Sequence, residues 1–84
     1  DPKWDNLKDI PIPEDCQWLW SHFLTLFYSC AIDINGNRIF RPVDILNYCE
    51  CFGIDMTYRE RKLMLSMKHW ACSVIYQLEN SKED

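Results

Sequence analysis

Hydrophobic residues recur at helical spacing in three stretches of the chain, and the longest stretch lies between Thr57 and Asn80. Glu60 follows Thr57 at the spacing of a capping box, in which each side chain accepts a hydrogen bond from a backbone N–H at the start of a helix. Behind this cap, one apolar stripe recurs at steps of three and four residues: Leu63, Met67, Trp70, Val74 and Leu78. The pattern predicts an amphipathic helix over residues 58–80, roughly 30 Å long, on which the rest of the chain packs.

Two shorter helices are predicted before the long one. The first covers residues 14–30, because Pro13 and the acidic pair after it suit a first helical turn and an apolar stripe follows. The second covers residues 42–52. It opens at Pro42 and ends where Gly53 can adopt the left-handed conformation of a helix C-cap.

The predicted fold is all-α, with one small three-helix domain over residues 14–80. Three of the four prolines fall in residues 1–13, which we therefore expect to form an extended arm with room for one short helical turn. The turn signal Asn35-Gly36 predicts an ordered loop between the first two helices, with a short hairpin over 32–40 as the alternative. Residues 81–84 are predicted to be a disordered polar tail.

Composition and charge exclude several classes of protein. Hydrophobic residues make up 48% of the chain, which is ample for a core and argues against intrinsic disorder. The net charge is −4, and the nine Lys and Arg residues form no basic stripe of the kind that nucleic-acid binding needs. No apolar run approaches the ~20 residues of a membrane span. We therefore expect neither a nucleic acid nor a membrane as partner.

The loop between the first two helices has the length of a calcium-binding EF-hand loop but not its full pattern. Oxygen-bearing side chains fall at loop positions 1, 3, 5 and 12: Asp33, Asn35, Asn37 and Asp44. The sixth position, where an EF-hand loop needs glycine, is Arg38, and an aspartate at the twelfth reaches less far than the usual glutamate. An Asn-Gly turn followed by an acidic helix start is the preferred interpretation.

The five cysteines lie mostly within helical patterns, beside large apolar residues. Their odd number argues against a disulfide framework, so we interpret them as buried free thiols in a reducing compartment. One combination supplies four zinc-type ligands: Cys49, Cys51, His69 and Cys72. Side chains two residues apart on a helix diverge, so we predict no metal and no cofactor, with a calcium- or zinc-binding module as an alternative.

No arrangement of residues indicates catalysis, and we expect a protein that is not an enzyme. The chain has only two glycines and no phosphate-binding or dinucleotide motif. Large aromatic and methionine side chains are abundant instead. Trp18 and Trp20 lie about 200° apart on their helix, so one small core does not cover both. Exposed apolar side chains mark protein interfaces. The predicted partner-binding residues are Trp4, Trp18, Trp20, Phe23, Met64 and Trp70.

Several landmarks occur in a fixed order along most of the chain, from Pro13 to Leu78. They are Pro13-Glu14, Trp18-Leu19, Phe23, Leu26, Pro42-Val43, Ile45, Tyr48, Gly53-Ile54, Glu60, Leu63, Met67 and Trp70. This order resembles a family of small tailed-phage proteins that are encoded near the tail genes and often labelled tail assembly chaperones or their downstream partners.

The resemblance implies an all-α assembly factor that binds the tape measure protein or tail-tube subunits before they polymerise. Such a factor acts by protein–protein binding, with self-association as a further option, and needs no cofactor. It would be found in the host cytoplasm. A structural virion component of the connector type, retained in the particle, is the alternative within the same setting.

Overall fold

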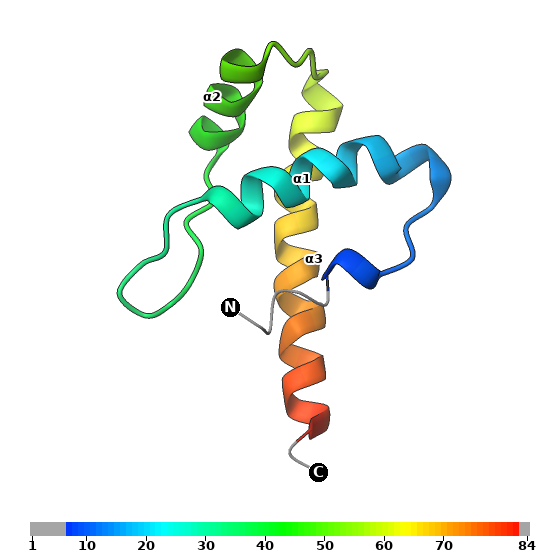
Figure 1. Ribbon diagram of the computed structural model, residues 1–84, viewed down its shortest axis with the longest axis vertical. Coiled ribbons are helices and arrows are strands. Elements are labelled where there is room, and N and C mark those ends of the chain that lie inside the picture. The colour runs from blue at the N-terminus through cyan, green and yellow to red at the C-terminus, as the bar shows by residue number, and fades with distance from the viewer. Residues whose placement is uncertain (1–6, 83–84) are drawn as a thin grey trace.

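In the computed structural model, the backbone is described for residues 7–82 and the side chains for residues 7–77. After a 3₁₀ turn at Glu14–Cys16, the helices are α1 (Gln17–Ser29), α2 (Pro42–Phe52) and α3 (Tyr58–Lys82) (Figure 1). The all-α three-helix fold is confirmed. The predicted first helix is three residues too long at its start, because Glu14–Cys16 is 3₁₀. α3 continues two residues beyond its predicted end and so includes the start of the predicted tail.

The three helices make a thin molecule. α1 crosses α3 steeply within the first half of the long helix, and α2 lies beside the first turns of α3 (Figure 1). The principal extents are 44 × 33 × 17 Å. The radius of gyration is 13.4 Å, against about 12 Å for a compact chain of this length. So thin a body cannot enclose all of its apolar side chains.

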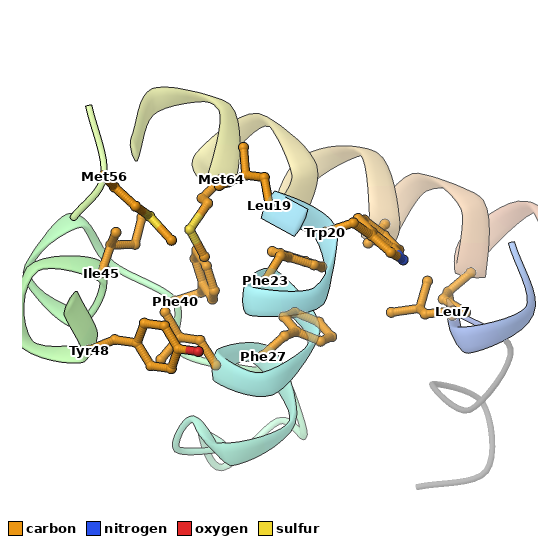
Figure 2. Packing of buried hydrophobic residues seen from close by; sticks show 13 residues of the cluster. Leu7, Leu19, Trp20, Phe23, Phe27, Phe40, Ile45, Tyr48, Met56 and Met64 are labelled. Atoms are coloured by element: carbon orange, nitrogen blue, oxygen red, sulfur yellow. The ribbon is translucent and has the colours of Figure 1, made fainter. Parts of the chain in front are cut away.

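α1 supplies the centre of the core. Its buried side chains are Leu19, Trp20, Phe23, Leu26 and Phe27. The ring of Phe23 stacks on Trp20 at 5.0 Å and on Phe27 at 5.2 Å between centroids, and Phe40 packs on it at 5.4 Å. Such pairs add about 0.5–1.5 kcal/mol each beyond area burial. Figure 2 shows the cluster continuing to Ile45, Met56 and Met64 at one end and to Leu7 at the other.

The long helix buries a different stripe from the predicted one. Among residues 58–77, its buried side chains are Met64, Ala71 and Ile75, whereas Leu63 is 49% exposed and Trp70 is 45% exposed. The two stripes lie about 100° apart around the helix, which is one residue step. Both stripes are apolar, so the helical period could not tell which one faces the core. The expectation that the chain packs on the Leu63–Trp70 stripe is wrong.

The capping box that starts α3 is confirmed. The backbone N–H of Thr57 donates to Oε1 of Glu60 at 2.8 Å, and the backbone N–H of Glu60 donates to Oγ1 of Thr57 at 3.2 Å. Gly53 ends α2 in the left-handed conformation at φ 65°, as its position predicted. The connection between α2 and α3 is therefore fixed at both ends by local chemistry.

The loop between α1 and α2 is ordered, and the hairpin alternative is reduced to one antiparallel bridge between Ile32 and Arg38. Gly36 takes the positive φ of 83° that the turn requires. Nη1 of Arg38 donates to the carbonyl of Phe27 at 2.8 Å. This bond satisfies a carbonyl in the last turn of α1, where a cation is also favoured by the helix dipole.

The described part of the N-terminal arm lies over the core. Residues 7–9 form a single 3₁₀ turn, and Leu7 is fully buried at the end of the hydrophobic cluster (Figure 2). Ile10 and Ile12 are partly buried against the same cluster. Residues 1–6 of the predicted arm, and the last two residues of the predicted tail, lie outside the described residues.

Candidate partner-binding surface

The structure divides the predicted partner-binding residues into an exposed and a buried group. Trp18 and Trp70 are about half exposed, so a partner can reach both. Phe23 and Met64 are fully buried and Trp20 is nearly so. These three are core residues that no partner can reach directly in this arrangement, which corrects the prediction. Trp4 lies outside the described residues.

Trp70 borders a groove between α3 and the segment that leads into α1, which we call the arm groove. The volume of this groove is about 250 Å³, and its lining residues are Ile12, Pro13, Cys16, Trp20, Leu63, Ser66, Met67 and Trp70. The rings of Trp20 and Trp70 meet edge to face, with 5.6 Å between their centroids. The lining carries no charged side chain, so the groove suits a large apolar group.

One polar atom is buried beside the arm groove. Nε1 of Trp20 is shielded from solvent and has no hydrogen-bond acceptor among the described residues. An unpaired buried donor costs about 1–3 kcal/mol. Contacts with the neighbouring rings, and not a hydrogen bond, therefore hold this indole in place.

A second groove of about 220 Å³, the α2–α3 groove, lies between α2 and the first turns of α3. Its lining residues are Pro42, Ile45, Leu46, Tyr58, Arg61, Lys62 and Leu65. The ammonium of Lys62 lies 5.3 Å from the centroid of the Tyr58 ring, and Nη1 of Arg61 donates to the carbonyl of Met56 at 3.0 Å. The groove therefore combines apolar side chains with two cations.

A depression across α3 joins the two grooves. Its lining residues are Arg59, Lys62, Leu63 and Ser66. Lys62 also lines the α2–α3 groove, while Leu63 and Ser66 also line the arm groove. We call the two grooves and the depression together the α3 surface. Sequence reasoning missed Leu63 and Tyr58 as surface residues. The signal that could have found them is the apolar arc of α3, which is wider than one buried stripe.

Trp18 belongs to a different part of the molecule and lines neither groove. Its ring meets His22 edge-on at 4.7 Å, and Nδ1 of His22 shares a 2.8 Å hydrogen bond with the hydroxyl of Tyr48. Tyr48 in turn packs on Phe52 at 5.0 Å between ring centroids. Burial raises the pKa of the Tyr48 phenol, so it remains a neutral hydrogen-bonding group at neutral pH. This aromatic row fastens α1 to α2.

The carboxylates of the calcium alternative are engaged within their own turns. Oδ1 of Asp33 accepts hydrogen bonds from the backbone N–H groups of Asn35 and Asn37, both at 2.9 Å. The carboxylate of Asp44 accepts the backbone N–H of Arg41 at 2.8 Å and forms a two-point ion pair with its guanidinium, with both distances at 3.1 Å. The guanidinium of Arg41 holds the pKa of Asp44 below its usual value. The loop thus closes through its own hydrogen bonds.

The cysteines of the zinc alternative do not gather at one point. Among the residues that the structure describes, no three His, Cys, Asp or Glu side chains are grouped so that they could hold a metal ion. All five cysteines are free thiols, but the prediction that they are buried is wrong, because none of them is fully buried. Cys51 is exposed, whereas the other four are partly buried. Burial raises the pKa of the thiols of Cys30 and Cys49.

Comparisons with protein-family models, with curated proteins and with solved structures find no match to this chain. Across the described part of the chain, none of the helices combines the length and the apolar character that crossing a membrane requires. The resemblance to tail assembly proteins therefore stays a prediction made from the sequence.

Proposed function

We propose that this protein is a non-enzymatic binding module whose partner is another protein, held at the α3 surface. The observation that supports this most directly is the arm groove, where Leu63 and Trp70 remain about half exposed beside an apolar hollow of about 250 Å³. Burying these two side chains under a partner would remove apolar area from water at about 25 cal/mol per Å². Half-exposed Trp side chains in such a position are typical anchors of protein interfaces.

The identity of the partner is proposed from the resemblance alone. In that setting the module binds the tape measure protein or tail-tube subunits and covers their apolar segments before polymerisation. Shielding exposed apolar surface requires neither a catalytic group nor a cofactor, which agrees with a surface made of side chains that pack instead of reacting.

The test is affinity capture of the tagged protein from host cells that carry the phage genome, with captured proteins identified by mass spectrometry. We expect a tape measure or tail-tube protein to be enriched, and this enrichment to be lost on Trp70→Ala. The matched control is Tyr76→Ala, an exposed aromatic on the same helix that lines neither groove.

Two results would contradict the proposal. One is that no phage protein is enriched by the wild-type chain; the other is that Trp70→Ala captures the same proteins as Tyr76→Ala does. Recovery of the protein in purified particles, with capture intact, would place it among virion components.

A further inference from the structure

The first half of α3 carries a cluster of cations that its own helix disfavours. Arg59, Arg61 and Lys62 lie within the first five residues of α3, where the helix dipole is positive and favours acidic side chains. The whole chain has a net charge of −4, so the cluster also differs in sign from the rest of the molecule. An arrangement that works against helix stability is expected at a functional surface.

Nearby acidic residues do not neutralise these cations. Glu60 is occupied by the cap of α3, and among the described residues no salt bridge joins Arg59, Arg61 or Lys62 to a carboxylate. Lys62 lies over the ring of Tyr58, and Arg61 donates to a backbone carbonyl. The positive charge of the cluster is therefore available to an outside group.

The cations separate the apolar arm groove from the α2–α3 groove, and two of them, Arg61 and Lys62, also line the α2–α3 groove. Arg59 and Lys62 line the depression, which meets the arm groove at Leu63 and Ser66, and Lys62 also lines the α2–α3 groove. Across the α3 surface, the order is therefore an apolar groove, the cations, and a groove whose lining is apolar apart from Arg61 and Lys62. A ligand that matches this order carries a large apolar group at each end and a negative charge between them.

We propose that the α3 surface binds a protein segment in which at least one Asp or Glu lies between two large apolar side chains. This inference rests on the proposed function and specifies the chemistry of its partner. A nucleic acid is disfavoured, because a cluster of three cations on a chain of net charge −4 neutralises few phosphates and the arm groove is lined by no charged side chain. An anionic membrane would be repelled by the same net charge.

The test is selection from a random 16-residue peptide library displayed on yeast, with the purified full chain as the target. We expect the selected peptides to be enriched in Asp or Glu between two large apolar residues. Selection of peptides without acidic enrichment, or of none that bind, would overturn the inference. Binding of anionic phosphatidylglycerol vesicles or of a duplex DNA oligonucleotide in preference to the selected peptides would also overturn it.

Variants of the chain locate the charge effect. The double variant Arg59→Gln/Lys62→Gln should weaken a selected peptide about fivefold, and about 0.5 M NaCl should weaken the wild-type complex similarly. Lys68→Gln is the matched control, since Lys68 is a cation of α3 that lines neither groove, and it should change binding less than about twofold. If Lys68→Gln weakened peptide binding as much as the double variant does, Arg59 and Lys62 would not be the cations that bind the acidic side chain. Circular dichroism confirms that each variant is folded.

The outcomes separate this inference from the proposed function. If captured phage protein depends on Trp70 but neither capture nor peptide binding depends on Arg59 and Lys62, the binding module stands and its acidic partner motif fails. If selected acidic peptides bind the Trp70→Ala variant as tightly as the wild type, the charge match stands and the arm groove is not the anchor.

Discussion

α1 and α3 use their apolar side chains in opposite ways. α1 is 13 residues long and buries five large side chains, three of them in a stack of rings, whereas α3 is 25 residues long and, among its described side chains, buries Met64, Ala71 and Ile75. Much of the remaining apolar surface of α3 stays exposed, as at Leu63 and Trp70. The shorter helix therefore organises the fold, and the longer one leaves apolar surface exposed.

This difference follows from the shape of the molecule. In a body 17 Å thin, α1 crosses one side of α3 (Figure 1), and Leu63 and Trp70 of the neighbouring stripe stay about half exposed. Because α3 is apolar over more than one stripe, its length and period show that it forms a helix but not that it dominates the core. The predictions below test whether α1 mainly stabilises the core while α3 keeps a buried stripe and an exposed one.

The largest expected effect comes from the centre of α1. Phe23→Ala removes a fully buried ring that stacks on Trp20 and Phe27, and it should lower the free energy of unfolding by about 3–5 kcal/mol, measured by urea denaturation. Trp18→Ala, on the exposed side of the same helix, should cost about 1 kcal/mol or less. Similar losses for the two variants would contradict the arrangement of α1.

A pair of neighbours on α3 tests the division between the buried and exposed stripes. Met64→Ala opens a cavity at a fully buried position and should cost about 2–5 kcal/mol in urea unfolding. Leu63→Ala, one residue earlier and half exposed, should cost less than about 1 kcal/mol but weaken partner binding. If Leu63→Ala destabilised the fold more than Met64→Ala, the predicted stripe and not the observed one would face the core.

Removing the cap of α3 should have a moderate effect on the free energy of unfolding. Thr57→Ala removes the acceptor of the Glu60 N–H and should lower the free energy of unfolding by about 0.5–2 kcal/mol. Ser73→Ala, an exposed serine inside the same helix, is the control and should be neutral or slightly stabilising because alanine favours helix. Thermal unfolding by circular dichroism measures both. If Thr57→Ala left the thermal unfolding unchanged, the capping box would not fix the start of α3.

The smallest effect is expected at the ion pair that starts α2, where Arg41 is exposed and Asp44 is partly exposed. Arg41 lowers the pKa of Asp44, so the pair stabilises the fold above the ordinary Asp value near 3.9, and this contribution is lost as pH falls through the lower folded value. The melting temperature of Asp44→Asn should therefore lie below that of the wild type at pH 6, and the difference should shrink below about pH 4. A difference that grows on acidification would contradict the sign of this shift.

Local sequence signals predicted the elements of this fold well. The capping box at Thr57, the C-cap at Gly53 and the turn at Gly36 all act through neighbouring residues, so their positions follow from the sequence itself. The choice between adjacent stripes of α3 depends on where α1 and the arm come to lie, and no local pattern encodes that. For the same reason the sequence placed Trp70 both on the stripe expected to face the core and among the partner-binding residues, and it did not show that Phe23 and Met64 are buried.

The candidate surface was predicted only in part. An excess of large apolar residues indicated that some would remain uncovered, and the 200° separation of Trp18 and Trp20 correctly placed one indole inside and one outside. The grooves themselves arise where α3 meets segments far away in sequence, such as Ile12 and Pro42. Local sequence patterns do not show which distant segments of the chain come into contact.

The uneven exposure of the five cysteines has a practical consequence for studying this molecule in solution. Thiol-reactive dyes attack the thiolate, and Cys51 is the exposed thiol, while burial raises the pKa of Cys30 and Cys49. A dye added at neutral pH should therefore attach first to Cys51, on α2 and outside both grooves. The native chain thus provides its own attachment point for a fluorescent reporter, whose emission could follow partner binding without any substitution.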